Sequence, residues 1–173
     1  MEIRRVRAGE ETAVGALTVA AYEPFLDGPD DPYVASLRGV ARRDAEAEVW
    51  VAVDDGAPLG AVTFCPVGSP WREIGRDDEG EFRMLAVAPA AQGRGVGRAL
   101  VEACLDRSRE AGFTGVALSS LPVQTGGHAL YASAGFRRDP SRDWAPYPGI
   151  DLWAFVRGLE GEHTGTARAR VTP

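Results

Sequence analysis

The segment from Val87 to Leu100 constrains the fold more than any other part of the chain. An apolar strand pattern ends at Pro89, glycines follow at positions 93, 95 and 97, and an amphipathic helix pattern begins near Val96. Glycine lets the backbone approach a ligand closely, and the N–H groups that open a helix point outward with the positive end of the helix dipole behind them. This order predicts a phosphate-binding loop between a strand and a helix.

The spacing of these glycines excludes two common phosphate loops. A nucleoside triphosphate loop requires a Gly-Lys pair, and the chain contains none. The dinucleotide pattern G-x-G-x-x-G/A reaches Arg98 when it starts at Gly93, and Leu100 when it starts at Gly95. We therefore expect neither a nucleoside triphosphate nor NAD at this loop.

The loop fits the pattern Gln/Arg-x-x-Gly-x-Gly/Ala through Gln92, Gly95 and Gly97, and it resembles the pyrophosphate loop of the GCN5-related N-acetyltransferases, the GNAT family. The strand before it and the later segment Leu130-Tyr131-Ala132-Ser133-Ala134-Gly135-Phe136 are similar to the same family, so the resemblance covers residues 80–138. It implies an α/β fold with a mixed central β-sheet flanked by helices. In that fold two neighbouring parallel strands, here 81–87 and 115–119, splay apart.

The resemblance also implies the cofactor, acetyl-CoA (coenzyme A). Main-chain groups of Leu85 and Val87 would pair with its pantetheine arm. Pro89 would mark the end of strand pairing, because it has no N–H to donate. The loop would hold the pyrophosphate, through Gln92, Gly93, Arg94, Gly95, Val96, Gly97 and Arg98.

Two residues are expected to carry the chemistry. An amine with a pKa near ~10 is almost entirely protonated at neutral pH, so a base must take its proton. Glu81 precedes Val87 on one strand, and the two-residue period puts both on the same face. The family often has an acidic residue at this point, so Glu81 is the predicted general base, with a solvated strand carboxylate as the alternative. Tyr131 occupies the family's position for the acid that protonates the departing thiolate.

Residues 122–124 and His128, which flank the start of the predicted helix at 127–134, are assigned no role in the site. Where many relatives have Asn after the fifth strand, this chain has Pro122-Val123-Gln124, and we place no pantetheine contact there. His128 is expected to be a residue of the helix surface.

The acceptor site is predicted from the loops that form it in the family. They supply acidic and aromatic side chains, namely Tyr22, Phe25, Asp27, Asp30, Asp31, Tyr33, Trp71, Asp143, Trp144 and Tyr147. Such groups suit a small cationic molecule that bears a primary amine, although the Asp-rich turn could equally serve to solvate a loop. Two alternatives remain: a protein N-terminal or lysine acetyltransferase, and a non-catalytic acyl-CoA-binding regulatory module.

Composition limits the remaining classes. The 173 residues, 45% of them hydrophobic, suit a single domain at 1–157, followed by a Gly-, Thr- and Arg-containing tail at 158–173 that we expect to be disordered. The net charge of −6 argues against nucleic-acid binding. Two cysteines and two histidines without metal-ligand spacing suggest neither a disulfide framework nor a metal site.

The chain has no long apolar run and no signal-peptide pattern, so we expect a cytoplasmic protein without membrane contact. The sequence leaves open whether the protein forms a homodimer. Hydrophobic periodicity and turn residues predict strands at 3–7, 49–53, 59–67, 81–87, 116–119 and 150–156, and helices at 10–21, 96–111, 127–134 and from Pro32 onward.

Overall fold

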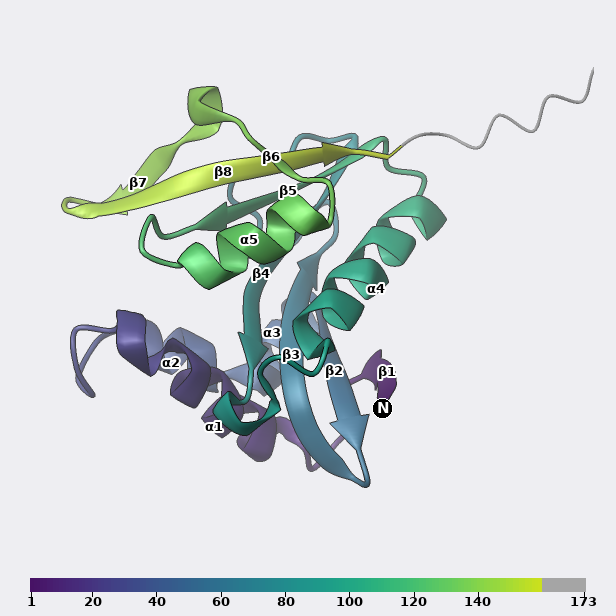
Figure 1. The fold of residues 1–173 in the computed structure, drawn as a ribbon, viewed down its shortest axis with the longest axis vertical. Helices are drawn as coiled ribbons and strands as arrows, with labels where there is room; N and C mark the ends of the chain where they lie inside the picture. Colours follow the sequence, from purple (N-terminus) through teal and green to yellow (C-terminus); the bar gives the residue numbers. More distant parts are fainter. Residues whose placement is uncertain (160–173) are drawn as a thin grey trace, which may run out of the picture.

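The computed structural model describes residues 1–159 of the chain. Helices and strands alternate along it, with a long hairpin in the middle (Figure 1). The strands are β1 Glu2–Arg5, β2 Glu48–Asp54, β3 Ala57–Cys65, β4 Glu79–Val87, β5 Gly115–Ser120, β6 Arg137–Arg138, β7 Trp144–Tyr147 and β8 Ile150–Gly158. The α-helices are α1 Glu11–Tyr22, α2 Tyr33–Arg38, α3 Val40–Glu46, α4 Val96–Glu110 and α5 Thr125–Ser133.

The strands form one mixed sheet in the order β1-β2-β3-β4-β5-β8-β6, and β7 pairs with β8. The β4–β5 pair is parallel, whereas the other pairs are antiparallel. The predicted fold class, an α/β fold with a mixed central sheet, is confirmed.

The parallel strands β4 and β5 pair only at their beginnings. Three residue pairs connect them, and the last is Glu81 with Ala117. Beyond this point β4 runs on to Val87 and β5 to Ser120 without pairing with each other. Figure 1 shows the two strands diverging. The predicted splay between these strands is therefore confirmed, and it leaves one side of β4 without a strand partner.

A bulge interrupts β4 at Met84, whose φ of 53° lies in the left-handed region. Arg83 pairs with Thr63 of β3, but the next recorded pair is Ala86 with Ala61, so β4 carries one extra residue. The extra residue reverses the alternation of side chains between the two faces, so positions an even number apart across the bulge lie on opposite faces. Consequently Glu81 and Arg83 lie on one face of the sheet, whereas Val87 lies on the other.

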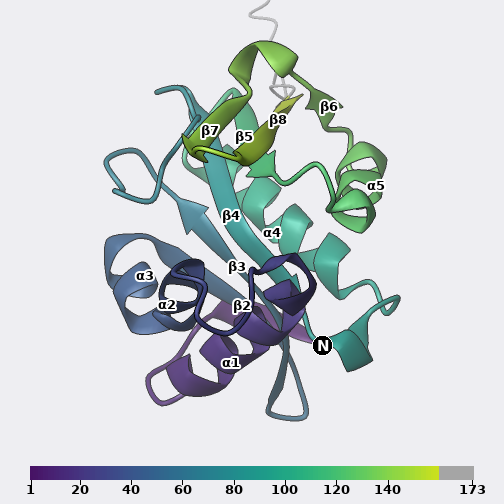
Figure 2. The same cartoon turned by 90° about the vertical axis from the view of Figure 1, so that its left-hand side faces the viewer.

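Helices cover both faces of the sheet (Figure 2). The larger hydrophobic core lies under α4 and α5, and it joins Leu100 and Tyr131 of these helices to Phe64 and Phe82 of the sheet. A smaller core lies under α1 and α3, where Val14 and Val40 pack on β2 and β3. The two faces of β4 thus meet different groups of helices.

Local departures from the prediction have identifiable causes. The helix expected to continue from Pro32 is divided at Gly39, whose ψ of 55° breaks the helical path between α2 and α3. Strands β6 and β7 were not predicted: β6 has two residues, and β7 contains Pro146, which argues against a strand in sequence. The predicted helix ends at Gly112 and Gly135 agree with their positive φ angles of 77° and 80°.

The predicted C-terminal tail falls almost entirely outside the described residues. Strand β8 reaches Gly158, and Leu159 packs against the larger core. Residues 160–173 are not described, so the prediction for this segment stays a prediction. Among residues 1–159, no helix combines the length and apolar character needed to span a membrane.

Replacing Gly60 by Ala tests the packing of α4 on the hairpin. A Cβ at this position would lie 2.7 Å from the Ala86 carbonyl oxygen and 2.8 Å from Val96 Cγ1. We expect Gly60→Ala to lower the free energy of unfolding by about 1–3 kcal/mol, because backbone must move. Gly126→Ala, where a Cβ meets nothing within 4 Å, is the control and should be neutral or slightly stabilising. Equal urea midpoints for the two variants would contradict this packing.

Candidate active site

The Gly-rich loop connects α4 to the end of β4 that no longer pairs with β5. The last bond to β3 is donated by the Ala88 N–H to the Leu59 carbonyl oxygen at 2.8 Å, and a turn of 3₁₀ helix follows from Pro89. Gly93 and Gly95 have φ angles of 75° and 80°, and a Cβ at either would meet nothing within 4 Å. The backbone therefore forms an open cradle that side chains at these two positions would fill.

Backbone donors converge on this cradle. The N–H groups of Gly95, Val96, Gly97 and Arg98 have no acceptor within the described part of the chain. Helix α4 has neither a side-chain cap nor an acidic residue in its first turn. Unpaired N–H groups together with the positive end of a helix dipole fit a diphosphate. The donor set and the open cradle thus fit the predicted cofactor.

Gly97 brings three elements together behind the loop. A Cβ there would approach Leu130 Cδ2 of α5 to 3.1 Å and Val87 Cγ2 of β4 to 3.5 Å. Val96, beside it, is buried in the core and fixes the start of α4. The absence of a side chain at position 97 therefore lets α4 begin close to the end of β4.

The two arginines of the loop already have partners. Arg94 forms an ion pair with Asp54 at 3.3 Å, and Arg98 Nη1 donates to Ser133 Oγ at 3.0 Å. Both side chains are exposed, as is Gln92. The structure thus gathers the predicted cofactor residues into one loop and the adjoining end of β4, and their binding roles stay predictions.

Tyr131 lies beside the point where β4 and β5 separate. Its ring centroid is 6.1 Å from that of Phe82, which follows the last β4 residue paired with β5, and 5.7 Å from that of Phe155. Burial, with a smaller contribution from Cys104, raises the pKa of the Tyr131 hydroxyl, which keeps its proton at neutral pH. Within residues 1–159 this hydroxyl has no hydrogen-bond partner and is not one of the fully enclosed polar atoms, so its proton is available to a ligand.

Glu81 lies on the opposite face and is 0% exposed. Its carboxylate accepts hydrogen bonds from the backbone N–H groups of Glu73 at 3.0 Å, Ile74 at 3.2 Å and Gly75 at 2.7 Å. Burial raises the pKa of this carboxyl, and the three N–H donors oppose the rise. Glu81 therefore fixes the loop before β4.

Two expectations about Glu81 are wrong. The bulge at Met84 shifts the side-chain alternation, so Glu81 does not share a face with Val87. Its complete burial also excludes the alternative of a solvated carboxylate. The predicted role as a general base is a separate matter and stays a prediction.

Glu73 was missed by sequence reasoning, which treated its loop as a connection. Its side chain is 14% exposed and lies 2.5 Å from the Arg83 guanidinium. Burial raises the pKa of Glu73 to about 7, repulsion by Glu81 adds to the rise, and Arg83 opposes it. A carboxyl with a pKa near neutrality is suited to proton transfer. The neighbouring Trp71 and Arg72, an aromatic and a charge in a polar loop, were the available signal.

Some of the predicted acceptor residues gather near Glu73. Tyr22 and Tyr33 have ring centroids 6.2 Å apart, and the Arg83 guanidinium lies 5.9 Å from the Trp71 ring centroid. Asp31 instead closes its own turn, because it accepts from the N–H groups of Asp27 and Tyr33. The Asp-rich segment thus has the local role that the sequence left open.

Other predicted acceptor residues are held elsewhere. Asp143 forms an ion pair with Arg138 at 2.6 Å, and Trp144 Nε1 donates to Ser119 Oγ at 3.1 Å. His128 is half-buried against Trp153 instead of lying on the surface, and its Nε2 is 3.2 Å from Ser120 Oγ.

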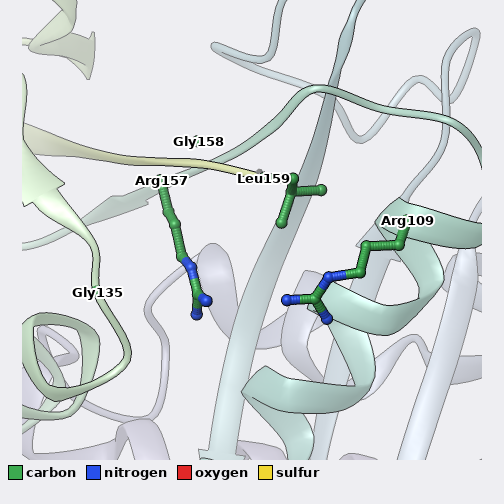
Figure 3. Close-up of a pocket in the computed structure, with 5 residues that line it drawn as sticks. All are labelled: Arg109, Gly135, Arg157, Gly158 and Leu159. Atoms are coloured by element: carbon green, nitrogen blue, oxygen red, sulfur yellow. The ribbon is translucent and has the colours of Figure 1, made fainter. Parts of the chain in front are cut away.

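A separate surface hollow lies at the far end of α4. Figure 3 shows the guanidinium groups of Arg109 and Arg157 facing it from two elements, with Gly135, Gly158 and Leu159 along its wall. Arg157 Nη1 donates to the Ala134 carbonyl oxygen, and Arg109 pairs with Asp106. The hollow contains none of the predicted site residues, and the Gly-rich loop lies at the opposite end of the helix.

Replacing Glu73 by Gln tests the raised pKa of this carboxyl. The folded protein binds the Glu73 proton more tightly than the unfolded chain, so this group stabilises the fold at low pH. That contribution is lost as the pH rises from about 4.5 to about 7. Urea unfolding across this range should therefore show wild type losing stability relative to Glu73→Gln. Parallel curves for the two proteins would place the pKa near its ordinary value.

Comparisons with known proteins agree with this geometry. The family model described as "Acetyltransferase (GNAT) family" matches residues 13–136. N-acetyltransferase 8F1 of Rattus norvegicus is 33% identical over 126 residues, which are 68% of this chain and 56% of that protein. This chain spans about half the length of the curated relatives that it matches first.

Solved structures share the fold. An acetyltransferase of the GNAT family from Staphylococcus aureus Mu50 has a TM-score of 0.72 at 13% identity, over 92% of this chain and 99% of that chain. YncA, a putative acetyltransferase from Salmonella typhimurium with its cofactor acetyl-CoA, has a TM-score of 0.67 at 20% identity, over 96% and 98%. Together with the diverging strands and the Gly-rich loop, these matches show that the chain belongs to the acetyltransferase (GNAT) family.

Proposed function

We propose that this protein is an acetyl-CoA-dependent N-acetyltransferase whose acceptor is the primary amine of a small molecule. The amine of the acceptor is protonated in solution and carries a positive charge until a base removes the proton. The amine attacks directly in a ternary complex. The observation that carries the proposal is the separation of β4 from β5 after Glu81, with the open N–H cradle at the end of the same strand.

The cofactor would lie along β4. Main-chain groups of Leu85 and Val87 face the side that β5 has left, and the N–H groups from Gly95 to Arg98 would bind the pyrophosphate. When bound, acetyl-CoA supplies an acetyl group activated as a thioester. The Salmonella structure with its acetyl-CoA supports this choice of cofactor.

Tyr131 is proposed to donate a proton to the departing thiolate. Its hydroxyl is protonated at neutral pH and free of intramolecular hydrogen bonds among residues 1–159. Its packing on Phe82 keeps it next to the strand separation. A fixed proton donor at this point makes the thiolate a better leaving group.

Two carboxylates on the other face are candidates for the proton acceptor. Glu81 remains the proposed base, and its complete burial means that it would act through a water molecule. Glu73 is the second candidate, because its side chain retains some exposure. Acid and base would then stand on opposite faces of β4, with the reacting groups between them.

A protein acceptor is the alternative, and the end of the β7–β8 hairpin favours it. Tyr147 is 71% exposed there and Ile150 is 44% exposed, so an apolar contact for a peptide is available. Acetylation of peptides in preference to free amines would support this alternative. A cytoplasmic location and a homodimer stay predictions.

Replacing Gly95 by Ala tests the cofactor loop. The methyl group would occupy the open cradle, so the Kd for coenzyme A should rise at least about tenfold in calorimetry. Gly28→Ala is the matched control, because Gly28 also has a positive φ, 89°, and open space around it. We expect Gly28→Ala to introduce similar backbone strain but to leave the Kd for coenzyme A unchanged. Unchanged binding in Gly95→Ala would remove the cradle from the cofactor site.

Replacing Tyr131 by Phe tests the proton donor. Loss of the hydroxyl should lower kcat by about 100-fold while leaving the affinity for acetyl-CoA nearly unchanged. Thr114→Val, which removes an exposed hydroxyl bonded to Asp78 beyond the C-terminal end of α4, serves as the control and should retain full turnover. Wild-type turnover in Tyr131→Phe would exclude Tyr131 from the chemistry.

The two carboxylates can be separated by pH–rate profiles of Glu81→Gln and Glu73→Gln. Loss of the base should lower kcat/KM by about 100-fold at neutral pH, and the deficit should shrink as the pH approaches the pKa of the amine. Glu79→Gln, a change on the same strand that breaks the ion pair between Glu79 and Arg142, is the control. Its kcat/KM should show no pH-dependent deficit. A deficit in Glu81→Gln that does not change with pH would show that Glu81 only holds the loop.

A further inference from the structure

Arg43 is a buried cation without a counter-charge. It projects from α3 and is 0% exposed. Its Nη1 donates to Thr63 Oγ1 at 2.7 Å and its Nη2 to the Leu37 carbonyl oxygen at 2.8 Å, both neutral acceptors. Its Nε is buried without a hydrogen-bond partner. Within residues 1–159 none of its three nitrogens therefore pairs with a carboxylate. Such burial of charge is strongly unfavourable unless an anion compensates it.

A second guanidinium lies beside it. Arg83 stands directly opposite Thr63 in the β3–β4 register, so both arginines lie on the α1–α3 face of the sheet. The Arg83 side chain is only 16% exposed and pairs with one carboxylate, Glu73, which does not reach Arg43. Repulsion by Arg83, after burial, contributes to lowering the pKa of Arg43 to about 10. Arg43 therefore stays protonated at neutral pH, and this carboxylate pairs with only one of the two cations.

Two tyrosines of this region do not compensate the charge. Tyr22 ends α1 and Tyr33 begins α2, and their ring centroids are 6.2 Å apart. Burial raises the pKa of each tyrosine, so neither supplies a negative charge at neutral pH. The surroundings therefore leave the positive charge uncompensated.

Arg83 has donors to spare. Its Nη1 donates to the Trp71 carbonyl oxygen at 3.1 Å, its Nη2 faces Glu73, and the Tyr33 hydroxyl is a further neighbour of the guanidinium. A guanidinium has five N–H groups, and its planar fork matches a carboxylate. Arg83 also lies two residues from Glu81, where β4 and β5 separate.

We propose that the acceptor of this enzyme carries a carboxylate as well as the reactive amine, and that Arg83 binds this carboxylate while Arg43 supports it electrostatically from behind Thr63. The substrate class is then amino acids and their derivatives with a free carboxylate. This inference rests on the proposed acetyl transfer to a small amine. It explains why two guanidinium groups are buried at an acceptor site that was expected to attract only a cation.

Matched acceptors test the proposal. Acetylation is measured for a panel of amino acids and for the carboxamide of each, which keeps the amine and removes the negative charge. Wild type should show a kcat/KM for the best carboxylate at least about tenfold above that for its amide. Arg83→Gln should abolish this preference mainly through KM, and Arg83→Lys should restore part of it, because lysine keeps the charge without the fork.

Arg109→Gln is the matched control. Arg109 lies at the far end of α4, where its exposed side chain pairs with Asp106. Removing it changes the net charge equally and should leave the preference intact. Comparing ratios between variants also cancels the difference in amine basicity between an acid and its amide.

Binding of the acetylated products gives a readout that does not depend on turnover. In calorimetry, wild type should bind the N-acetyl amino acid more tightly than its amide. Arg83→Gln should bind the two ligands with equal affinity. Acetylation without any preference for the carboxylate in wild type would overturn the inference and leave the proposed function standing. Binding of coenzyme A without acetylation of either acceptor would overturn the inference, and the proposed function would fall with it only if simple primary amines were not acetylated either.

Discussion

The separation of β4 from β5 after a single short stretch of pairing is the constraint on which the rest of the site depends. Parallel pairing ends at Glu81, so the backbone of β4 remains open on one side up to Val87. A strand with unpaired N–H and C=O groups needs a partner. The loop that follows turns those groups toward the same ligand, because Gly97 lets α4 start against the end of β4.

Because of the bulge at Met84, the two faces of β4 present different kinds of side chain to the site. Phe82 and Val87 face α4 and α5, where Tyr131 keeps a protonated hydroxyl beside the separation. Glu81 and Arg83 face the opposite helices, where charges gather with little solvent. Glu81 also binds three consecutive N–H groups of the loop that carries Glu73, so the position of one carboxylate depends on the other.

The local sequence predicted most of the fold because glycine positions and apolar spacing are short-range signals. The loop at Gly93–Gly97, the strand separation and the helix that carries Tyr131 followed from such patterns or from the family resemblance. The bulge could not be predicted, because Met84 carries no signal for a positive φ. Glu73, Arg43 and Arg83 could not be grouped either, since their association depends on the β3–β4 register and on a loop that folds back over the sheet.

Titration of the purified protein with acetyl-CoA in a calorimeter tests the central claim most directly, with coenzyme A, ATP and NAD as comparisons. The account predicts saturable binding of acetyl-CoA and coenzyme A at one site, and no comparable binding of ATP or NAD, because the loop has the glycine spacing of neither. Failure of both CoA species to bind would contradict it, and the cradle would then be a structural connection between β4 and α4.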